Sequence, residues 1–164
     1  MDREEHRKLQ LFEGIDRAIE DPGWMVMAIP DAAPPFCYTV GLIKSFNHPE
    51  IIVLGLRYEI AHPLLNTVGF QIKQGEVFSP GNRYDSITQK YDTQFVEVAL
   101  ENISEYFGIL IGYMRHHNDA TPIRALQLVW PDPQNRFPWE QGFDEKFRTA
   151  QPLLTEEFRI QNPE

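Results

Sequence analysis

The chain has 164 residues, of which 42% are hydrophobic and 24% charged, the balance expected of a globular protein of one domain. Its formal net charge of −9, with the 15 basic residues spread singly, argues against binding to nucleic-acid phosphates or to anionic membranes. A charged N-terminus without a signal-peptide core and a single cysteine, which excludes an intramolecular disulfide, predict a cytoplasmic location.

The first third of the chain predicts one helix followed by three strands. Apolar residues at helical spacing indicate an amphipathic helix over residues 3–20, and Pro22-Gly23 would end it. Residues 24–29 and 36–42 are β-type runs separated by a proline-rich turn, so they predict a hairpin. Residues 51–56 are apolar on both faces, which is typical of a central strand.

The rest of the chain adds two helices and two strands. Helical spacing predicts helices over residues 58–74 and 101–117, the second with Asn102 as its cap. Strands are expected over residues 94–98 and 123–130, followed by loops and a short apolar and acidic tail. These elements predict an α+β fold with a mixed, mostly antiparallel sheet of about five strands and three helices. We expect residues 1–22 to form an N-terminal helix and residues 23–164 a single α+β domain.

The segment from Tyr38 to Glu50 offers the first candidate site residues. Tyr38 and Thr39 lie near the end of a predicted strand and could line a pocket. His48 and Glu50 flank a proline that stiffens the loop, and either could act as a catalytic acid or base. The alternative is structural: Glu50 would pair with an arginine, and His48 would be an ordinary loop residue.

The second candidate segment follows the last predicted strand. Asp132 is the third candidate catalytic residue, and Trp130, Arg136 and Trp139 are candidate ligand-binding residues beside it. Alternatively, the two tryptophans hold a loop on the sheet and Asp132 caps a turn. Pro49 and Pro131 fix the backbone where each strand exits, and we expect residues 38–50 and 130–132 to meet in one pocket.

Other kinds of site have little support in the sequence. Arg83, in the polar loop 79–90, could bind an anion together with backbone amides, although a surface salt bridge explains it equally well. Five histidines without metal-ligand spacing give no reason to expect a metal, and Cys37 in an apolar strand is typical of a buried core residue. The cofactor is unknown from these patterns.

Several short motifs resemble the bacterial domain-of-unknown-function family 4262 (DUF4262). The likeness covers about residues 23–154 and leaves the N-terminal helix outside. The family implies no settled activity. The matching motifs are Gly23-Trp24, Tyr38-Thr39-Val40-Gly41-Leu42, His48-Pro49-Glu50, Leu65-Asn66 with Gly75, Pro80-Gly81, Gln127-Leu128-Val129-Trp130-Pro131-Asp132, Phe137-Pro138-Trp139 and Gln151-Pro152-Leu153-Leu154.

The order of elements alone also resembles the start of flavin-reductase-type split barrels. That likeness implies flavin binding, with Lys44, Arg57 and Arg83 as the candidate contacts to its phosphate.

Two hypotheses for function follow from these residues. In the first, the protein binds a small molecule in a pocket formed by residues 38–50 and 130–132, and the sequence leaves open whether it is an enzyme. In the second, it is a non-enzymatic interaction module, such as an immunity or regulatory protein, whose acidic surface binds a basic protein partner.

Overall fold

The structure is a computed structural model and describes residues 1–155. The apolar and acidic tail expected after residue 154 lies almost wholly outside the described residues. In chain order the elements are α1 (Arg3–Glu20), β1 (Met25–Ile29), β2 (Phe36–Val40), α2 (Leu42–Phe46), β3 (Glu50–Leu54), α3 (Tyr58–Lys73), β4 (Gln94–Glu97), α4 (Leu100–Tyr106), α5 (Gly108–His116), β5 (Ala125–Val129) and a short 3-10 helix (Glu145–Phe147).

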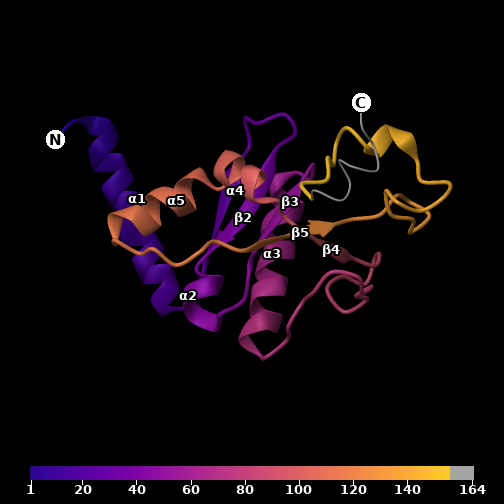
Figure 1. Cartoon of the computed structure of the whole chain (residues 1–164), viewed down its shortest axis with the longest axis horizontal. Helices are drawn as coiled ribbons and strands as arrows, with labels where there is room; N and C mark the ends of the chain where they lie inside the picture. The colour runs from indigo at the N-terminus through magenta and orange to yellow at the C-terminus, as the bar shows by residue number, and fades with distance from the viewer. Residues whose placement is uncertain (156–164) are drawn as a thin grey trace.

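One mixed sheet forms the centre of the molecule (Figure 1), and its strands lie in the order β1-β2-β3-β5-β4. Three neighbouring pairs are antiparallel, and only β3 and β5 run parallel. The prediction of a mostly antiparallel sheet of five strands with helices is therefore confirmed. The sheet is open, because β1 and β4 are its two edges, so the likeness to a split barrel has no support here.

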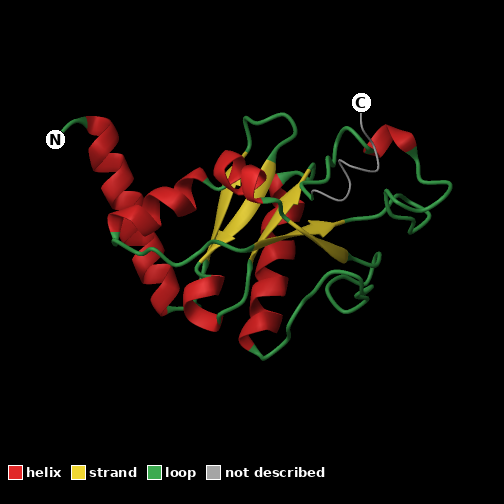
Figure 2. Cartoon of the chain, in the orientation of Figure 1, coloured by secondary structure: helices red, strands yellow, loops and turns green. Residues whose placement is uncertain are grey.

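Helices cover both faces of this sheet (Figure 2). On one face α3 packs Leu65 and Val68 against Ile51 and Val53 of β3. On the other face α1, α4 and α5 cover the alternate residues of β3, including Ile52. Strand β3 is buried along its whole length, as its apolar sequence predicts for a central strand. α1 contributes to the second cluster, while the proposed division at residue 22 stays a prediction.

Three helical details differ from the prediction. Helix α2 was expected to be the end of a strand and a loop, but Gly41, with φ of 128°, ends β2 and lets the chain turn directly into a helix. The helix expected over residues 101–117 is divided at Phe107, whose φ of −104° and ψ of 39° lie outside the helical region. Asn102 is not a cap: it lies inside α4 and donates to the Leu154 carbonyl oxygen.

The segment after β5 has little regular structure, yet two glutamine side chains hold it in place. The Gln151 amide accepts from the Trp130 N–H and donates to the Trp130 carbonyl, each at 2.8 Å. The Gln127 amide donates to the Pro152 carbonyl at 2.9 Å and accepts from the Leu154 N–H at 2.8 Å. Each amide thus replaces a strand-like pair of backbone hydrogen bonds, so the loop is fixed without a strand.

No helix within residues 1–155 has the length and apolar character needed to cross a membrane.

Candidate functional site

A buried carboxylate fixes the turn between β2 and α2. Glu50, at the start of β3, is 1% exposed, and its side chain accepts four hydrogen bonds. The donors are the Thr39 hydroxyl at 2.8 Å and the backbone N–H groups of Leu42, Gly41 and Ile43 at 3.0, 3.1 and 3.2 Å. Every neighbour is a donor, so the carboxylate compensates groups that would otherwise be buried without a partner.

Burial and hydrogen bonding act in opposite directions on the acidity of Glu50. Desolvation raises its pKa to about 7, against the lowering effect of the Thr39 hydroxyl and the three backbone N–H groups. The group therefore changes protonation state near neutral pH. Its two oxygens already accept four hydrogen bonds, which hold the turn. Glu50 is therefore not available as a nucleophile toward a ligand.

A cavity of about 300 Å³ lies beside Glu50. Its walls come from α1, the end of β2, α2, α5 and the loop before β5. The lining residues are Ile19, Val40, Gly41, Ile43, Lys44, Asn47, Glu50, Leu110, Tyr113, Met114, Asp119 and Thr121. Its volume falls at the lower end of the range of about 300–1,000 Å³ typical of ligand pockets.

Polar contacts fix the wall formed by α5. The Tyr113 hydroxyl donates to Oδ1 of Asp16 on α1, and the same oxygen lies 3.0 Å from His117 Nε2. Oδ1 of Asp119 accepts from both the N–H and the hydroxyl of Thr121, at 3.0 and 2.6 Å. The contacts of Asp16 join α1 to α5, and the bonds to Asp119 order the loop that follows α5.

His48 does not line this cavity, although it lies two residues before Glu50 in the sequence. Its ring is 3% exposed, with Nδ1 at 2.8 Å from the Pro49 carbonyl and Nε2 accepting from the Phe78 N–H at 3.1 Å. The ring is therefore neutral, and desolvation lowers its pKa. Both nitrogens have partners within the protein, the arrangement of a structural histidine.

Tyr38 and Thr39 are interior residues of β2. The Tyr38 hydroxyl accepts from the Ile109 N–H at 3.1 Å, and burial raises the pKa of this phenol to about 12. The Thr39 hydroxyl donates to Glu50 and accepts from the Ile51 N–H at 2.9 Å. Neither side chain lines the cavity. Their role is to position their hydrogen-bond partners, Ile109 for Tyr38 and Glu50 and Ile51 for Thr39.

The expectation that residues 38–50 and 130–132 meet in one pocket is wrong. Parallel pairing places Glu50 opposite Ala125, the first residue of β5, whereas Asp132 follows the last. Four residues of strand separate these ends by roughly 13 Å, before the further residues to Asp132 are counted. Glu50 and Asp132 consequently lie at opposite ends of the sheet.

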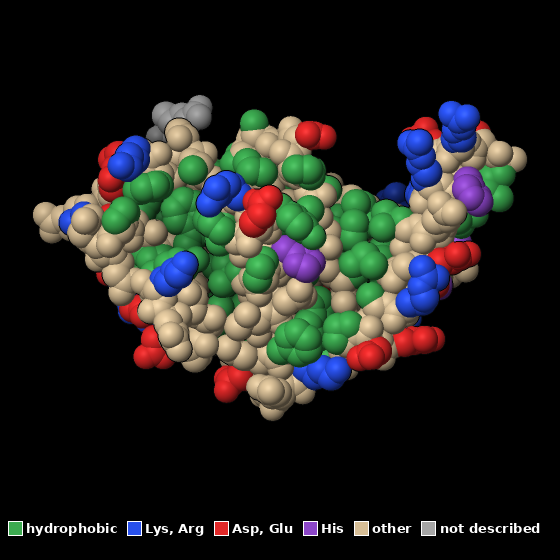
Figure 3. All heavy atoms as spheres, turned by 180° about the vertical axis from the view of Figure 1, so that it is seen from behind, with side chains coloured by type: hydrophobic (Ala, Val, Ile, Leu, Met, Phe, Trp, Pro, Cys, Tyr) green, Lys and Arg blue, Asp and Glu red, His purple; other side chains and the backbone are tan. Residues whose placement is uncertain are grey.

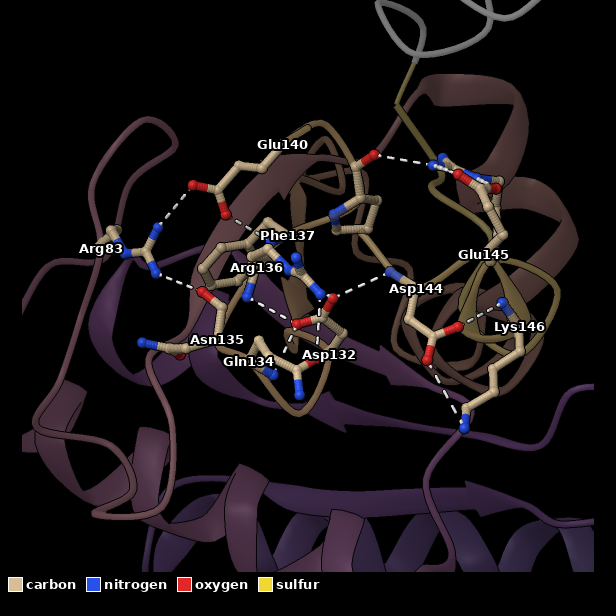
Figure 4. A network of polar contacts seen from close by, with 12 residues as sticks. Arg83, Asp132, Gln134, Asn135, Arg136, Phe137, Glu140, Asp144, Glu145 and Lys146 are labelled. Atoms are coloured by element: carbon tan, nitrogen blue, oxygen red, sulfur yellow. Dashed lines mark hydrogen bonds and ion pairs between the residues drawn. The ribbon is translucent and has the colours of Figure 1, made fainter. Parts of the chain in front are cut away.

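Asp132 is the centre of a separate polar network in the C-terminal loop (Figure 4). Its Oδ1 accepts from the N–H groups of Gln134 and Arg136, both at 3.0 Å. Its Oδ2 accepts from the Asp144 N–H at 3.0 Å and from Arg136 Nε at 3.1 Å. Desolvation opposes ionisation, but the bonds from Arg136, Asp144 and Gln134 together hold the pKa of Asp132 below its usual value.

The remaining candidates reinforce the same loop. Arg83 pairs with Asp92 and Glu140, both at 3.1 Å, and its guanidinium lies 4.8 Å from the centre of the Phe137 ring. Phe137 stacks on Trp139 with ring centres 5.4 Å apart, and Trp139 is 41% exposed. Trp130 is buried and donates from Nε1 to the Leu54 carbonyl at 2.8 Å. These contacts match the structural alternative for this segment.

Replacing Asp132 by asparagine is expected to lower the melting temperature and loosen the loop over residues 131–145. An amide would present N–H groups to donors that now share a carboxylate, leaving buried N–H groups without an acceptor. Thermal unfolding and limited proteolysis measure the two effects, with the exposed Asp85→Asn as control. Equal melting temperatures for the two variants would contradict this structural role.

Sequence reasoning missed most of the cavity wall, including Tyr113, Asp119 and Thr121. The one available signal was Asp119-Ala120-Thr121, a pattern in which an aspartate side chain orders the following turn. Lys44 was considered only as a flavin contact, yet it lines the cavity. Within residues 1–155 no group of three or more His, Cys, Asp or Glu side chains is arranged to hold a metal ion.

A family model described as domain of unknown function (DUF4262) matches residues 18–144, and the chain belongs to this family. The match begins in the last turn of α1 and ends before Gln151–Leu154, so it starts and stops earlier than the resemblance predicted. No curated protein and no solved structure matches the chain.

Proposed function

We propose that this protein binds a small, largely apolar molecule in the cavity beside Glu50. The observation that carries the proposal is a space of about 300 Å³ lined by both apolar and polar side chains. The apolar lining includes Ile19, Val40, Leu110 and Met114. A pocket with a mainly apolar lining and a few placed polar groups is the usual form of a ligand site.

The walls of this cavity are held in place before any ligand arrives. Glu50 fixes the Gly41–Ile43 backbone on one side, while Tyr113 and Asp16 join α5 to α1 on the other. A preformed site loses less conformational entropy on binding, which supports affinity for a small ligand. In this proposal Glu50 positions the wall, and His48 and Asp132 lie outside the binding site.

Filling the cavity should abolish binding. We expect 4-methylpentan-1-ol, a neutral apolar probe, to shift backbone amide NMR signals of the lining residues in the wild-type protein. Ile43→Trp adds a large ring to the cavity lining and should remove these shifts, whereas Leu100→Trp, at a site 79% exposed on α4, should retain them. Shifts scattered over the surface, or shifts unchanged in Ile43→Trp, would overturn the proposal.

A second candidate function is protein interaction. Its support is three exposed hydrophobic residues of α3: Tyr58 and Phe70 are 49% and 50% exposed, and Ile60 is 40% exposed. Hydrophobic side chains gather in neighbouring clusters on the face seen from behind (Figure 3), with acidic and basic side chains interspersed. Because acidic and basic side chains are interspersed there, this surface suits an apolar contact better than binding of a basic partner through an acidic surface. A cytoplasmic location remains a prediction for either function.

A further inference from the structure

Two opposite charges line the cavity. Lys44 comes from α2 and Asp119 from the loop after α5, and both line the cavity. Hydrogen bonds from Thr121 lower the pKa of Asp119, with smaller contributions from Lys44 and His117, so its carboxylate is ionised. Among residues 1–155 the Lys44 ammonium forms no ion pair with Asp119, so the two charges are separated by more than a direct contact.

Among the charged lining residues, these two retain hydrogen-bonding capacity that Glu50 has used. Both Thr121 donors go to Oδ1 of Asp119, and Oδ2 receives no hydrogen bond from the described part of the chain. Glu50 already accepts four bonds, and the Tyr113 hydroxyl donates to Asp16. The charged groups of the lining therefore offer a ligand one ammonium donor and one carboxylate acceptor.

We propose that the ligand is a small zwitterion with an apolar side chain, in the chemical class of apolar α-amino acids. Its carboxylate meets Lys44, its ammonium meets Asp119, and its side chain enters the space lined by Leu110 and Met114. This inference rests on the proposed function and adds the charge pattern of the ligand.

Charge matching explains why a zwitterion suits this cavity better than a ligand of single charge. A monoanion would satisfy Lys44 but bring its negative group close to Asp119, and a monocation would do the reverse. A charged group that loses water without gaining a partner costs free energy on binding. Only a ligand with both charges compensates both sides.

The test compares four probes that share a similar branched alkyl group, each titrated into the full-length protein and followed by amide NMR shifts. They are L-leucine, 4-methylpentanoate, 3-methylbutylamine and 4-methylpentan-1-ol. We expect L-leucine to bind roughly tenfold or more tightly than either singly charged probe, since each charged hydrogen bond contributes at least that factor. L-Valine and L-phenylalanine extend the series to smaller and larger side chains.

Variants of the two charges separate their roles. Lys44→Met should reduce the affinity for L-leucine to that for 3-methylbutylamine, and Asp119→Asn should reduce it to that for 4-methylpentanoate. Lys90→Met and Asp31→Asn remove the same charges at exposed positions outside the cavity and should change neither affinity.

The outcomes distinguish the two proposals. Binding of the neutral alcohol at the cavity with no gain for any of the three amino acids would overturn the zwitterion inference and leave the proposed function standing. Failure of all the probes to shift the lining amides would overturn both. A preference for L-leucine that persists in both Lys44→Met and Asp119→Asn would also overturn the inference, because the charges would then have no part in recognition.

Discussion

Replacing Gly69 by alanine is expected to lower the free energy of unfolding by about 3 kcal/mol, as strong overpacking of a core does. A Cβ atom at this position would lie 2.5 Å from Cζ2 and 2.9 Å from Nε1 of Trp24. The same substitution in an open helix normally stabilises by up to about 1 kcal/mol. The sign of the change therefore reports directly on the contact between α3 and Trp24.

The Trp24 ring cannot move aside to make room. It is 2% exposed, its Nε1–H donates to Asn66 Oδ1 at 3.0 Å, and Phe70 packs edge-on with ring centres 4.9 Å apart. Moving the ring would break this hydrogen bond and disturb the core on that face of the sheet. The clash must therefore be relieved by shifting α3 itself.

Urea denaturation followed by circular dichroism measures the effect, and Gly108→Ala is the matched control. Gly108 is the first residue of α5, and nothing lies within 4 Å of a Cβ added there. Trp24→Phe removes the atoms that the new methyl group meets, so the double variant should be less destabilised than the sum of the two single changes. A Gly69→Ala protein as stable as Gly108→Ala would show that α3 and the Trp24 ring leave room for a methyl group between them.

Features that depend on one segment of the chain could be predicted from the sequence, whereas contacts between distant segments, such as that between Gly69 and Trp24, could not. Helices α1 and α3 follow from apolar spacing along a single segment, and both bounds of α1 were predicted correctly. Spacing did not reveal the break at Phe107, because this residue continues the apolar stripe of its helix and is fully buried. The close approach of Gly69 to Trp24 depends on tertiary packing between distant segments, which periodicity does not contain.

The position of the candidate site was harder to predict than the fold. Glu50 begins one strand and Asp132 follows another, but strand patterns do not reveal that β3 and β5 run parallel and so place these residues at opposite ends of the sheet. The cavity also depends on α5. The apolar spacing of this segment predicts a helix but does not indicate that Tyr113 and the following Asp119 line a cavity. The structural alternatives for His48 and Asp132 describe their hydrogen bonds better than the functional ones.

Replacing Glu50 by alanine should also have a large effect, lowering the free energy of unfolding by about 4 kcal/mol, as the loss of a buried and fully bonded charge does. The change leaves the Leu42, Gly41 and Ile43 N–H groups without their acceptor. Glu50→Gln should cost less, about 2 kcal/mol, since the amide oxygen can still accept from two of these donors. Glu97→Gln and Glu97→Ala, at an exposed site on β4, are the matched controls.

Wild-type stability should also depend on pH through Glu50. Burial raises its pKa from the ordinary 4.5 to about 7, so the folded protein binds this proton more tightly than the unfolded chain does. The resulting stabilisation is fully present below pH 4.5 and is lost as the pH rises through about 7. The difference between the two pKa values corresponds to about 3 kcal/mol of free energy.

The contribution of Glu50 can be measured by urea denaturation of the wild type and of Glu50→Gln from pH 4 to pH 8. Because glutamine does not titrate, the difference between the two proteins separates the effect of Glu50 from that of other groups. We expect the stability advantage of the wild type over Glu50→Gln to shrink as the pH rises, and the difference between wild type and Glu97→Gln to stay nearly constant. An advantage that grows with pH would mean that the four hydrogen bonds outweigh burial and hold Glu50 ionised. In that case Glu50 would be a permanent anion that fixes the cavity wall at every pH.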